Sequence, residues 1–416
     1  MYFLYNIIVN SANVILKIVA IFNKKIHLFI EGRKDVFKKL ESHFSVNDAV
    51  IWFHCASLGE FEQGRPIIEK TKSQYPNYKI LVTFFSPSGY EIRKDYATAD
   101  LVTYLPFDTK KNVKKFLEIV NPQLAIFVKY EFWPNLLKEL QVKDVKTVLV
   151  SGIFRKNQSF FKSYGGWMKK SLKTFDHFFV QNQQSKDLLK EIGFENVTIS
   201  GDTRFDRVYD ITKQDNNLEF VKQFIDNKTT LIAGSTWPKD EELLVNYINT
   251  KAGANQKFII APHNIHGNEI EKLKRSVLKE TVLYSEIDGE DLSTFQVLII
   301  DTIGLLSKVY KHANIAYVGG GFGAGIHNLL EPATFGIPII IGPNYHKFKE
   351  AKELIDGEAC IVITNSSELN NELTMLFTNV NTRINKGNVA RNYVLDNTGA
   401  TFIIIDYIDK TIIKKK

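Results

Sequence analysis

The chain has 416 residues, which is enough for two domains with sizeable cores. Its formal net charge is +7, from 53 Lys and Arg against 46 Asp and Glu, so we expect an anionic partner. Anionic lipid, nucleotide and nucleic acid all meet that expectation. Nucleic acid is the least favoured of the three and is not predicted as a partner, because the chain shows no zinc-finger spacing, arginine-rich tract or RNP-like motif.

The first thirty residues are predicted to form a membrane-anchor or interfacial helix. Residues 2–22 are mostly apolar but include Lys17 and three asparagines. Four basic residues follow, namely Lys24, Lys25, Arg33 and Lys34. The run is long enough to span a bilayer, and basic residues on its C-terminal side would then hold the main body in the cytoplasm. An amphipathic helix lying in the interface and a core helix of the first domain are the alternatives. A cleaved signal peptide is not expected, because no basic stretch precedes the run and no A-x-A site ends it.

The first half of the chain alternates strands and helices, the pattern of a parallel doubly wound sheet. The expected strands are 49–55, 79–84, 101–104, 124–129, 146–150 and 177–181, and the expected helices are 60–73, 87–95, 109–119, 134–140, 164–173 and 183–192. Cys55 and Cys360 are the two cysteines, which excludes a disulfide framework and fits a reducing compartment. Cys55 follows His54, but adjacent strand residues point to opposite faces, so a buried thiol is favoured over a nucleophile pair.

The second half restarts the same pattern after a polar segment, 214–229, that we interpret as a linker. Its expected strands are 231–233, 257–261, 281–284, 296–300, 315–318, 338–341 and 360–363. The predicted organisation is an anchor over 1–30, an acceptor domain over 31–213, a nucleotide-sugar domain over 229–398, and a C-terminal helix with a basic tail over 399–416. Two α/β halves facing across a cleft indicate a twin-Rossmann transferase.

Ligands of open α/β sheets bind outside the carboxyl ends of the strands, so the residues after each strand are the candidate site. Ser57, Gly59 and Glu60 follow the first strand, and Glu131 follows the fourth. A carboxylate at a helix start is held ionised by the helix dipole and can take a proton from a hydroxyl group. On spacing alone, an ordinary first-turn glutamate is the simpler interpretation of Glu60.

The run Gly319–Pro332 joins an apolar strand to a helix start through several glycines. Glycine lets a backbone approach a phosphate closely, and free N–H groups at a helix start favour negative charge, so an anion site is predicted here. The run fits neither the P-loop pattern nor a Rossmann fingerprint. Glu331 is ambiguous, because it can pair with Asn328 in a capping box or accept hydrogen bonds from ribose hydroxyls.

Taken together, these motifs resemble the 3-deoxy-D-manno-octulosonic acid (Kdo) transferases. The resemblance covers nearly the whole chain and is carried by His54–Glu60, Tyr130–Asn135, Ala233–Thr236, His327–Ala333 and Gly342–Pro343. It implies a GT-B fold, an N-terminal membrane anchor, CMP-Kdo as donor and the 6′-hydroxyl of a tetraacyl lipid A precursor as acceptor. It also implies that the enzyme acts on the cytoplasmic face of the inner membrane and requires no cofactor and no metal.

The resemblance also implies a role for each matching residue. Glu60 matches the catalytic base, with Ser57, Gly59 and Glu131 in the acceptor part of the cleft. The donor-binding residues would be Arg155, Arg204, Ser235, Gly320, Gly321, Asn328 and Glu331. The chain departs from the usual family pattern at Ser151–Arg155, Arg204, Pro262–Asn264 and Lys347, although most of the basic charge is kept.

Two other functions remain open on the sequence. One is a GT-B glycosyltransferase that uses a nucleoside-diphosphate sugar and a lipid acceptor, since a diphosphate would suit the same glycine loop. The other is a membrane-bound nucleotide sensor without catalytic activity, which would not need Glu60. The runs Ser57–Glu60 and Tyr130–Asn135 favour the Kdo transferase.

Overall fold

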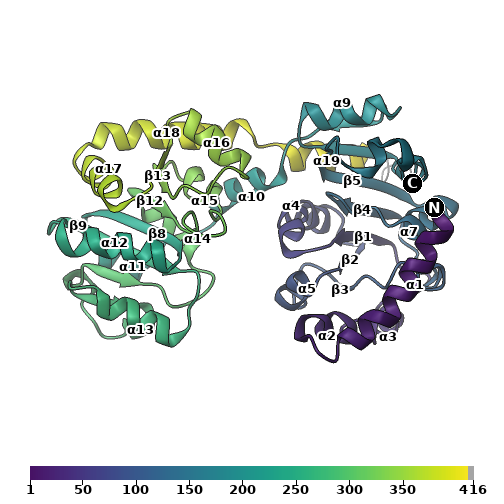
Figure 1. Cartoon of the computed structure of the whole chain (residues 1–416), viewed down its shortest axis with the longest axis horizontal. Helices are drawn as coiled ribbons and strands as arrows, with labels where there is room; N and C mark the ends of the chain where they lie inside the picture. The colour runs from purple at the N-terminus through teal and green to yellow at the C-terminus, as the bar shows by residue number, and fades with distance from the viewer. Residues whose placement is uncertain (411–416) are drawn as a thin grey trace. The chain divides into compact units, whose positions relative to one another are not determined.

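The computed structural model describes residues 1–410, so the end of the predicted basic tail, 411–416, lies outside the described residues. The chain divides into two compact units (Figure 1). The N-terminal unit comprises Met1–Arg207 together with the C-terminal segment that starts at Thr398, and the C-terminal unit is Val208–Asn397. Each unit holds one parallel seven-stranded sheet, so the predicted pair of Rossmann-like α/β units is confirmed.

The sheet of the N-terminal unit has the strand order β3-β2-β1-β4-β5-β6-β7. Its strands are β1 (Val50–Cys55), β2 (Lys79–Phe84), β3 (Leu101–Tyr104), β4 (Leu124–Val128), β5 (Lys146–Gly152), β6 (His177–Val180) and β7 (Val197–Ile199). Most are continuous apolar runs, as expected of strands that are buried on both faces. Alternate residues divide between two cores: Val50 and Trp52 join one, and Ile51, Phe53 and Cys55 the other.

Helices cover both faces of this sheet. They are α1 (Tyr2–Val19), α2 (Lys24–Glu31), α3 (Val36–His43), α4 (Leu58–Gln74), α5 (Pro87–Arg93), α6 (Lys110–Val120), α7 (Pro134–Val142), α8 (Gly166–Leu172), α9 (Gln183–Glu191) and the start of α10 (Thr203–Thr212). Apolar residues of α3, α6, α7, α8 and α9 pack into one core, and those of α4 pack into the other.

The sheet of the C-terminal unit has the order β10-β11-β9-β8-β12-β13-β14. Its strands are β8 (Thr229–Thr236), β9 (Gln256–Pro262), β10 (Thr281–Leu283), β11 (Val297–Ile299), β12 (Ile315–Val318), β13 (Ile339–Ile341) and β14 (Cys360–Val362). Its helices are α11 (Glu219–Ile225), α12 (Pro238–Thr250), α13 (Gly267–Ser276), α14 (Leu306–Val309), α15 (Leu330–Thr334), α16 (Lys349–Asp356), α17 (Ser366–Thr378) and α18 (Val380–Asp396).

The segment interpreted as a linker contains a helix that the sequence analysis does not predict. Within 214–229, helix α11 buries Val221 and Phe224 completely. Four of its seven residues are apolar, namely Phe220, Val221, Phe224 and Ile225, but a segment this short lies below the window of about 11 residues over which helical periodicity can be recognised. The chain instead passes from one unit to the other within α10, between Arg207 and Val208.

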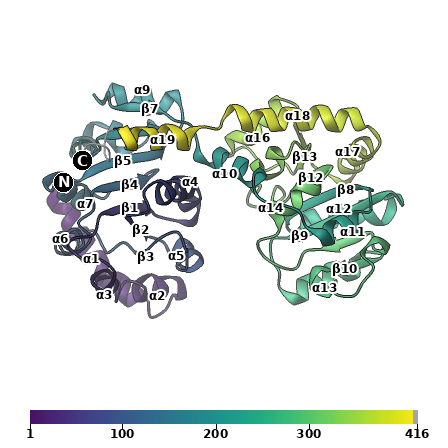
Figure 2. The ribbon, with the colours of Figure 1, turned by 180° about the vertical axis from the view of Figure 1, so that it is seen from behind.

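Helix α1 is apolar but not part of a core. It is long and apolar enough to cross a membrane by length and composition, and none of its residues whose burial is described is buried. The third sequence-based alternative, a core helix, is therefore wrong. Figure 2 shows α1 running along the outside of the N-terminal unit toward α2 and α3.

The last helix, α19 (Ala400–Ile408), belongs to the N-terminal unit. Asp206 caps its start by accepting hydrogen bonds from Gly399 N and from Thr401 N and Oγ1. Ile404 and Ile408 are fully buried in the core that α4 shares, which explains why a segment from the far end of the sequence completes this unit (Figure 1).

Replacing Ile404 with Ala therefore destabilises the N-terminal unit by about 2–5 kcal/mol, since it removes buried methylene groups and leaves a cavity. Phe402→Ala on the same helix is the matched control, because Phe402 is 74% exposed. This substitution lowers the free energy of unfolding by less than about 0.5 kcal/mol. Hydrogen exchange of the β1 and β4 amides measures both effects. Equal effects of the two substitutions, or faster exchange confined to β8, would contradict the packing of α19 on this unit.

Candidate functional site

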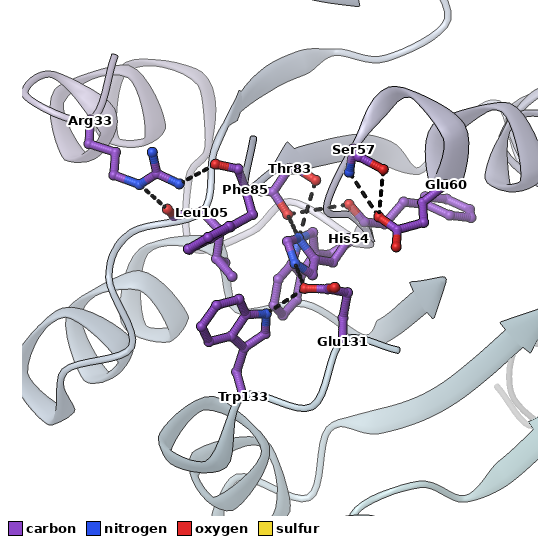
Figure 3. A network of polar contacts seen from close by, with 11 residues as sticks. Arg33, His54, Ser57, Glu60, Thr83, Phe85, Leu105, Glu131 and Trp133 are labelled. Atoms are coloured by element: carbon purple, nitrogen blue, oxygen red, sulfur yellow. Dashed lines mark hydrogen bonds and ion pairs between the residues drawn. The ribbon is translucent and has the colours of Figure 1, made fainter. Parts of the chain in front are cut away.

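The strand order of the N-terminal sheet reverses between β1 and β4, and the loops after these two strands meet at this switch point. The loop after β1 ends at Ser57, the N-cap of α4, and Gly59 and Glu60 lie in the first turn of that helix. The loop after β4 carries Glu131. The sequence-predicted residues of the acceptor part therefore come together, from segments about seventy positions apart in the sequence (Figure 3).

Glu60 closes a capping box at the start of α4. Its Oε2 accepts hydrogen bonds from Ser57 N at 2.8 Å and Ser57 Oγ at 3.1 Å. The pattern Ser-x-x-Glu before a helix is the sequence signature of this cap. Among the described residues, no hydrogen bond to Oε1 of Glu60 is found, so this oxygen is the one that can meet a substrate.

Glu131 is held by a second set of hydrogen bonds. Its Oε2 lies 3.2 Å from His54 Nε2 and accepts from Trp133 Nε1 at 2.8 Å (Figure 3). His54 is completely buried, and its Nδ1 lies 2.9 Å from Thr83 Oγ1, which also accepts from Trp52 Nε1. A carboxylate only accepts, so His54 Nε2 carries the proton of this contact.

The environment raises the pKa of Glu60 above its ordinary value. Burial is the larger cause and the negative charge of Glu131 the second, while the hydrogen bonds from Ser57 and the charge of Lys129 act in the opposite direction. A carboxyl group with a raised pKa is better matched to proton transfer near neutral pH than an ordinary surface carboxylate. The raised pKa of Glu60 is therefore compatible with proton transfer near neutral pH.

Arg33 ties the neighbouring loops to α2. Its guanidinium donates to the carbonyl oxygens of Phe29, Phe85 and Leu105, at 2.7, 2.6 and 3.0 Å (Figure 3). It also lies 3.8 Å from the ring centroid of Phe29, and burial lowers the pKa of Arg33 to about 9. The sequence analysis groups Arg33 with the cations that flank the apolar helix, whereas the structure shows it inside the unit.

Three strand ends in the two units hold non-glycine residues with left-handed backbone. They are Lys129 after β4 (φ 65°), Ser151 in β5 (φ 53°) and Ser235 in β8 (φ 53°). Such conformations cost free energy and persist where the surrounding structure holds them, often at functional sites. Ser235 is one of the donor-binding residues predicted from the sequence.

In the C-terminal unit the switch point lies between β8 and β12. The loop after β12 contains Gly320 and Gly321, and it approaches neighbouring backbone too closely for side chains. A Cβ at Gly321 would lie 2.6 Å from the backbone of Gly342, and Gly320 has a φ of 92°. These glycines are needed for the loop itself.

Asp240, at the start of α12, holds this glycine loop. Its carboxylate accepts from Gly320 N at 2.9 Å, Trp237 N at 2.9 Å and Tyr317 Oη at 2.7 Å, and it is completely buried. The Gly320 N–H is therefore already used and is not available to a phosphate. The sequence analysis expects this N–H to face an anion, and it does not identify Asp240.

Asn328 and Glu331 contact each other, but not as the capping box that the sequence suggests. Asn328 Nδ2 donates to Glu331 Oε1 at 3.0 Å, and Asn328 Oδ1 accepts from Leu330 N at 3.1 Å. The N-cap residue of α15 is Leu329, whose side chain makes no capping hydrogen bond. Asn328 is exposed and Glu331 half-buried, so contact of Glu331 with ribose hydroxyls remains compatible with its geometry.

An aromatic stack missed by the sequence analysis lies beside the glycine loop. Trp237 stacks on His263 with ring centroids 4.5 Å apart, and Trp237 Nε1 donates to His327 Nε2 at 3.0 Å. His263 and His327 are 4.6 Å apart. Each residue follows a different strand, β8, β9 or β12, so the shared carboxyl edge of the sheet is the signal that identifies them.

The two predicted arginines differ in their surroundings. Arg204 Nε and Nη2 both donate to Asp202 Oδ2, at 2.9 and 2.8 Å. Arg155 is exposed, and its guanidinium lies 5.8 Å from the ring centroid of Tyr130. Within residues 1–410, no group of three or more His, Cys, Asp or Glu side chains lies close enough to hold a metal ion.

Solved structures share this fold. UDP-GlcNAc 2-epimerase from Neisseria meningitidis bound to UDP-GlcNAc matches with a TM-score of 0.61 at 14% identity, over 87% of this chain and 100% of that one. MurG of Acinetobacter baumannii matches with a TM-score of 0.54 at 11% identity, over 88% and 100%. These likenesses show the GT-B fold alone.

Sequence comparison identifies the family. The family model described as 3-deoxy-D-manno-octulosonic-acid transferase (kdotransferase) matches residues 31–207. A 3-deoxy-D-manno-octulosonic acid transferase of Aquifex aeolicus is 31% identical over 333 residues, which cover 78% of this chain and 85% of that relative. The chain therefore belongs to the Kdo transferase family of glycosyltransferases.

Proposed function

We propose that this protein transfers Kdo from CMP-Kdo to the 6′-hydroxyl of a tetraacyl lipid A precursor, with inversion at the sugar carbon. The observation that carries the proposal is the pair Glu60 and Glu131 at the switch point of the N-terminal sheet, in a chain of the Kdo transferase family. The proposal needs no metal or other cofactor.

In the proposed reaction Glu60 accepts the proton of the acceptor hydroxyl through Oε1. The hydroxyl oxygen then forms a bond to the anomeric carbon of Kdo from the face opposite the leaving group. The bond from that carbon to the phosphate oxygen breaks, and CMP leaves with the electron pair. Because CMP already carries a phosphate that stabilises this charge, hydrogen-bond donors fixed by the protein can assist its departure.

The donor would bind the C-terminal unit, where Ser235 lies at the end of β8 and Gly321 and Glu331 follow β12, the two strands of the switch point. Glu331 would accept hydrogen bonds from the ribose hydroxyls, and the basic residues Arg155 and Arg204 would attract the Kdo carboxylate. In Arg204, the pairing with Asp202 would hold the guanidinium in one orientation.

We further propose that α1 attaches the protein to the cytoplasmic face of the inner membrane. Its apolar side chains are exposed along its whole length, as in Phe3, Ile8 and Ile15, and Lys24 and Lys25 follow it. A membrane-bound enzyme is suited to a lipid acceptor, because both are then confined to the same surface. Basic residues on this side favour the cytoplasmic face.

Glu60→Gln tests the chemistry. Glutamine can occupy the same capping-box position, so the start of α4 is preserved, but it cannot accept a proton near neutral pH. We expect kcat to fall about a hundred- to ten-thousand-fold in Kdo transfer to the tetraacyl acceptor, with CMP affinity unchanged. Glu69→Gln, on the exposed side of the same helix, is the control and stays near wild type. A loss within about threefold for Glu60→Gln would exclude Glu60 as the base.

Glu131→Gln tests the electrostatic coupling. The base must be deprotonated to work, so kcat/KM falls as the pH decreases through the pKa of Glu60. Removing the negative charge of Glu131 lowers that pKa, and the acidic limb of the pH profile moves to lower pH. Burial still raises the pKa, so the shift is partial. The control Glu118→Gln, on the surface of α6, leaves the acidic limb of the pH profile unchanged. An unchanged acidic limb in Glu131→Gln would contradict the electrostatic coupling of Glu131 to Glu60.

CMP binding tests the donor. CMP raises the midpoint of thermal unfolding by binding the native protein, and UDP and GDP raise it less. Glu331→Ala abolishes the stabilisation by CMP, whereas Glu290→Ala, an exposed carboxylate of the same unit, does not. Equal stabilisation by UDP would favour a nucleoside-diphosphate sugar donor. Unchanged stabilisation of Glu331→Ala by CMP would mean that Glu331 has only a structural role at the start of α15.

A further inference from the structure

The first turns of α1 are fixed to the N-terminal unit by polar contacts. Tyr5 Oη donates to Asp108 Oδ2 at 2.6 Å, Tyr2 Oη donates to Asn135 Oδ1 at 2.5 Å, and Asn135 Nδ2 donates to Asn6 Oδ1 at 3.0 Å. Asp108 and Asn135 are each 3% exposed. The start of α1 thus has a defined place beside the loops after β3 and β4, although the helix contributes nothing to a core.

A cavity of about 590 Å³ lies between α1 and the start of α6. Its lining is formed by Tyr2, Phe3, Asn6 and Asn10 on one side and by Thr109, Lys110, Lys111 and Asn112 on the other. The volume corresponds to about twenty water molecules, which is enough for a small polar group such as a phosphate with a short alcohol.

The positive charge of this cavity is not neutralised within the protein. Lys110 and Lys111 are exposed, and no ion pair to either is found among residues 1–410. The ammonium of Lys110 lies 5.5 Å from the ring centroid of Tyr2, and that of Lys138 lies 5.0 Å from it. The nearby carboxylate of Asp108 accepts from Asn135 N and Leu136 N as well as from Tyr5, and does not pair with these lysines.

The side of α1 at the cavity is amphipathic. Tyr2, Asn6 and Asn10 follow one another at intervals of four and form a polar strip, since the side-chain amide of each asparagine donates to the carbonyl oxygen four residues earlier. Next to this strip are Phe3 and Ile7, which are 79% and 46% exposed. Asn6 and Asn10, two of the asparagines that interrupt the apolar run in the sequence, therefore line a basic cavity.

We propose that this cavity binds the headgroup of an anionic phospholipid of the bilayer. The phosphate would contact Lys110 and Lys111, the polar strip would contact the rest of the headgroup, and the acyl chains would lie along the exposed apolar side chains of α1. A soluble nucleotide or free phosphate would satisfy the lysines but leave Phe3 and Ile7 in water, so an amphiphilic ligand fits both halves of the surface. The site does not depend on the proposed transfer reaction.

Native mass spectrometry of the full chain in neutral detergent micelles tests the site directly. We expect phosphatidylglycerol to bind more tightly than phosphatidylcholine at equal concentration. The double variant Lys110→Ala with Lys111→Ala weakens phosphatidylglycerol binding about tenfold or more, because each lysine near an anionic headgroup contributes roughly fivefold. Both lysines are exposed, so the substitutions leave the fold intact.

The matched control is Lys114→Ala with Lys115→Ala, which removes the same charge from the same helix but from residues that pair with Glu118 and Glu41. It changes phosphatidylglycerol binding less than about threefold. Equal losses of phosphatidylglycerol affinity in both double variants would mean that the lipid responds only to the general surface charge. Equal binding of phosphatidylglycerol and phosphatidylcholine by the wild type would mean that the cavity does not recognise an anionic headgroup. Displacement by inorganic phosphate alone would indicate a phosphate site, and a loss confined to the tetraacyl acceptor would assign the cavity to the substrate. Each of these results overturns the proposal.

Discussion

The reversal of strand order between β1 and β4 is the constraint on which the candidate site depends. Parallel strands all end at one edge, and at the reversal the connecting helices leave in opposite directions, so the loops after β1 and β4 border a common opening. Glu60, in the helix turn that follows the first of these loops, and Glu131, on the second, lie close enough for the charge of Glu131 to raise the pKa of Glu60. The same constraint places Ser235 and the glycine loop together in the C-terminal unit.

Around this opening, residues without a proposed role in the reaction hold the candidate site residues in place by hydrogen bonds. His54 and Trp133 bind the same oxygen of Glu131, and Ser57 binds one oxygen of Glu60. In the other unit Asp240 plays the corresponding part for the glycine loop. These hydrogen bonds offset part of the cost of burying such polar groups, and they also fix the orientation of the side chains.

The sequence was sufficient for the two α/β units and for nearly all strands, because continuous apolar runs bounded by polar segments are a strong signal. It was not sufficient for α11, which is too short for its apolar spacing to stand out, or for the assignment of α19 to the N-terminal unit, which depends on a contact between distant segments. At the site, the strand-end rule was enough to find Glu60 and Glu131. The rule puts Trp237 and His263 at strand ends but does not predict that they stack, and it missed Asp240, because the partners of a loop depend on tertiary packing rather than on spacing.

The central claim is that this protein transfers Kdo to a lipid acceptor. In the most direct measurement, the purified full chain is incubated with a tetraacyl lipid A precursor and CMP-Kdo generated in situ, and the masses of the lipid products are determined by mass spectrometry. The account predicts acceptor that has gained the mass of one or more Kdo residues, together with released CMP. Unchanged acceptor, or a gain of sugar mass only when a nucleoside-diphosphate sugar replaces CMP-Kdo, would contradict it.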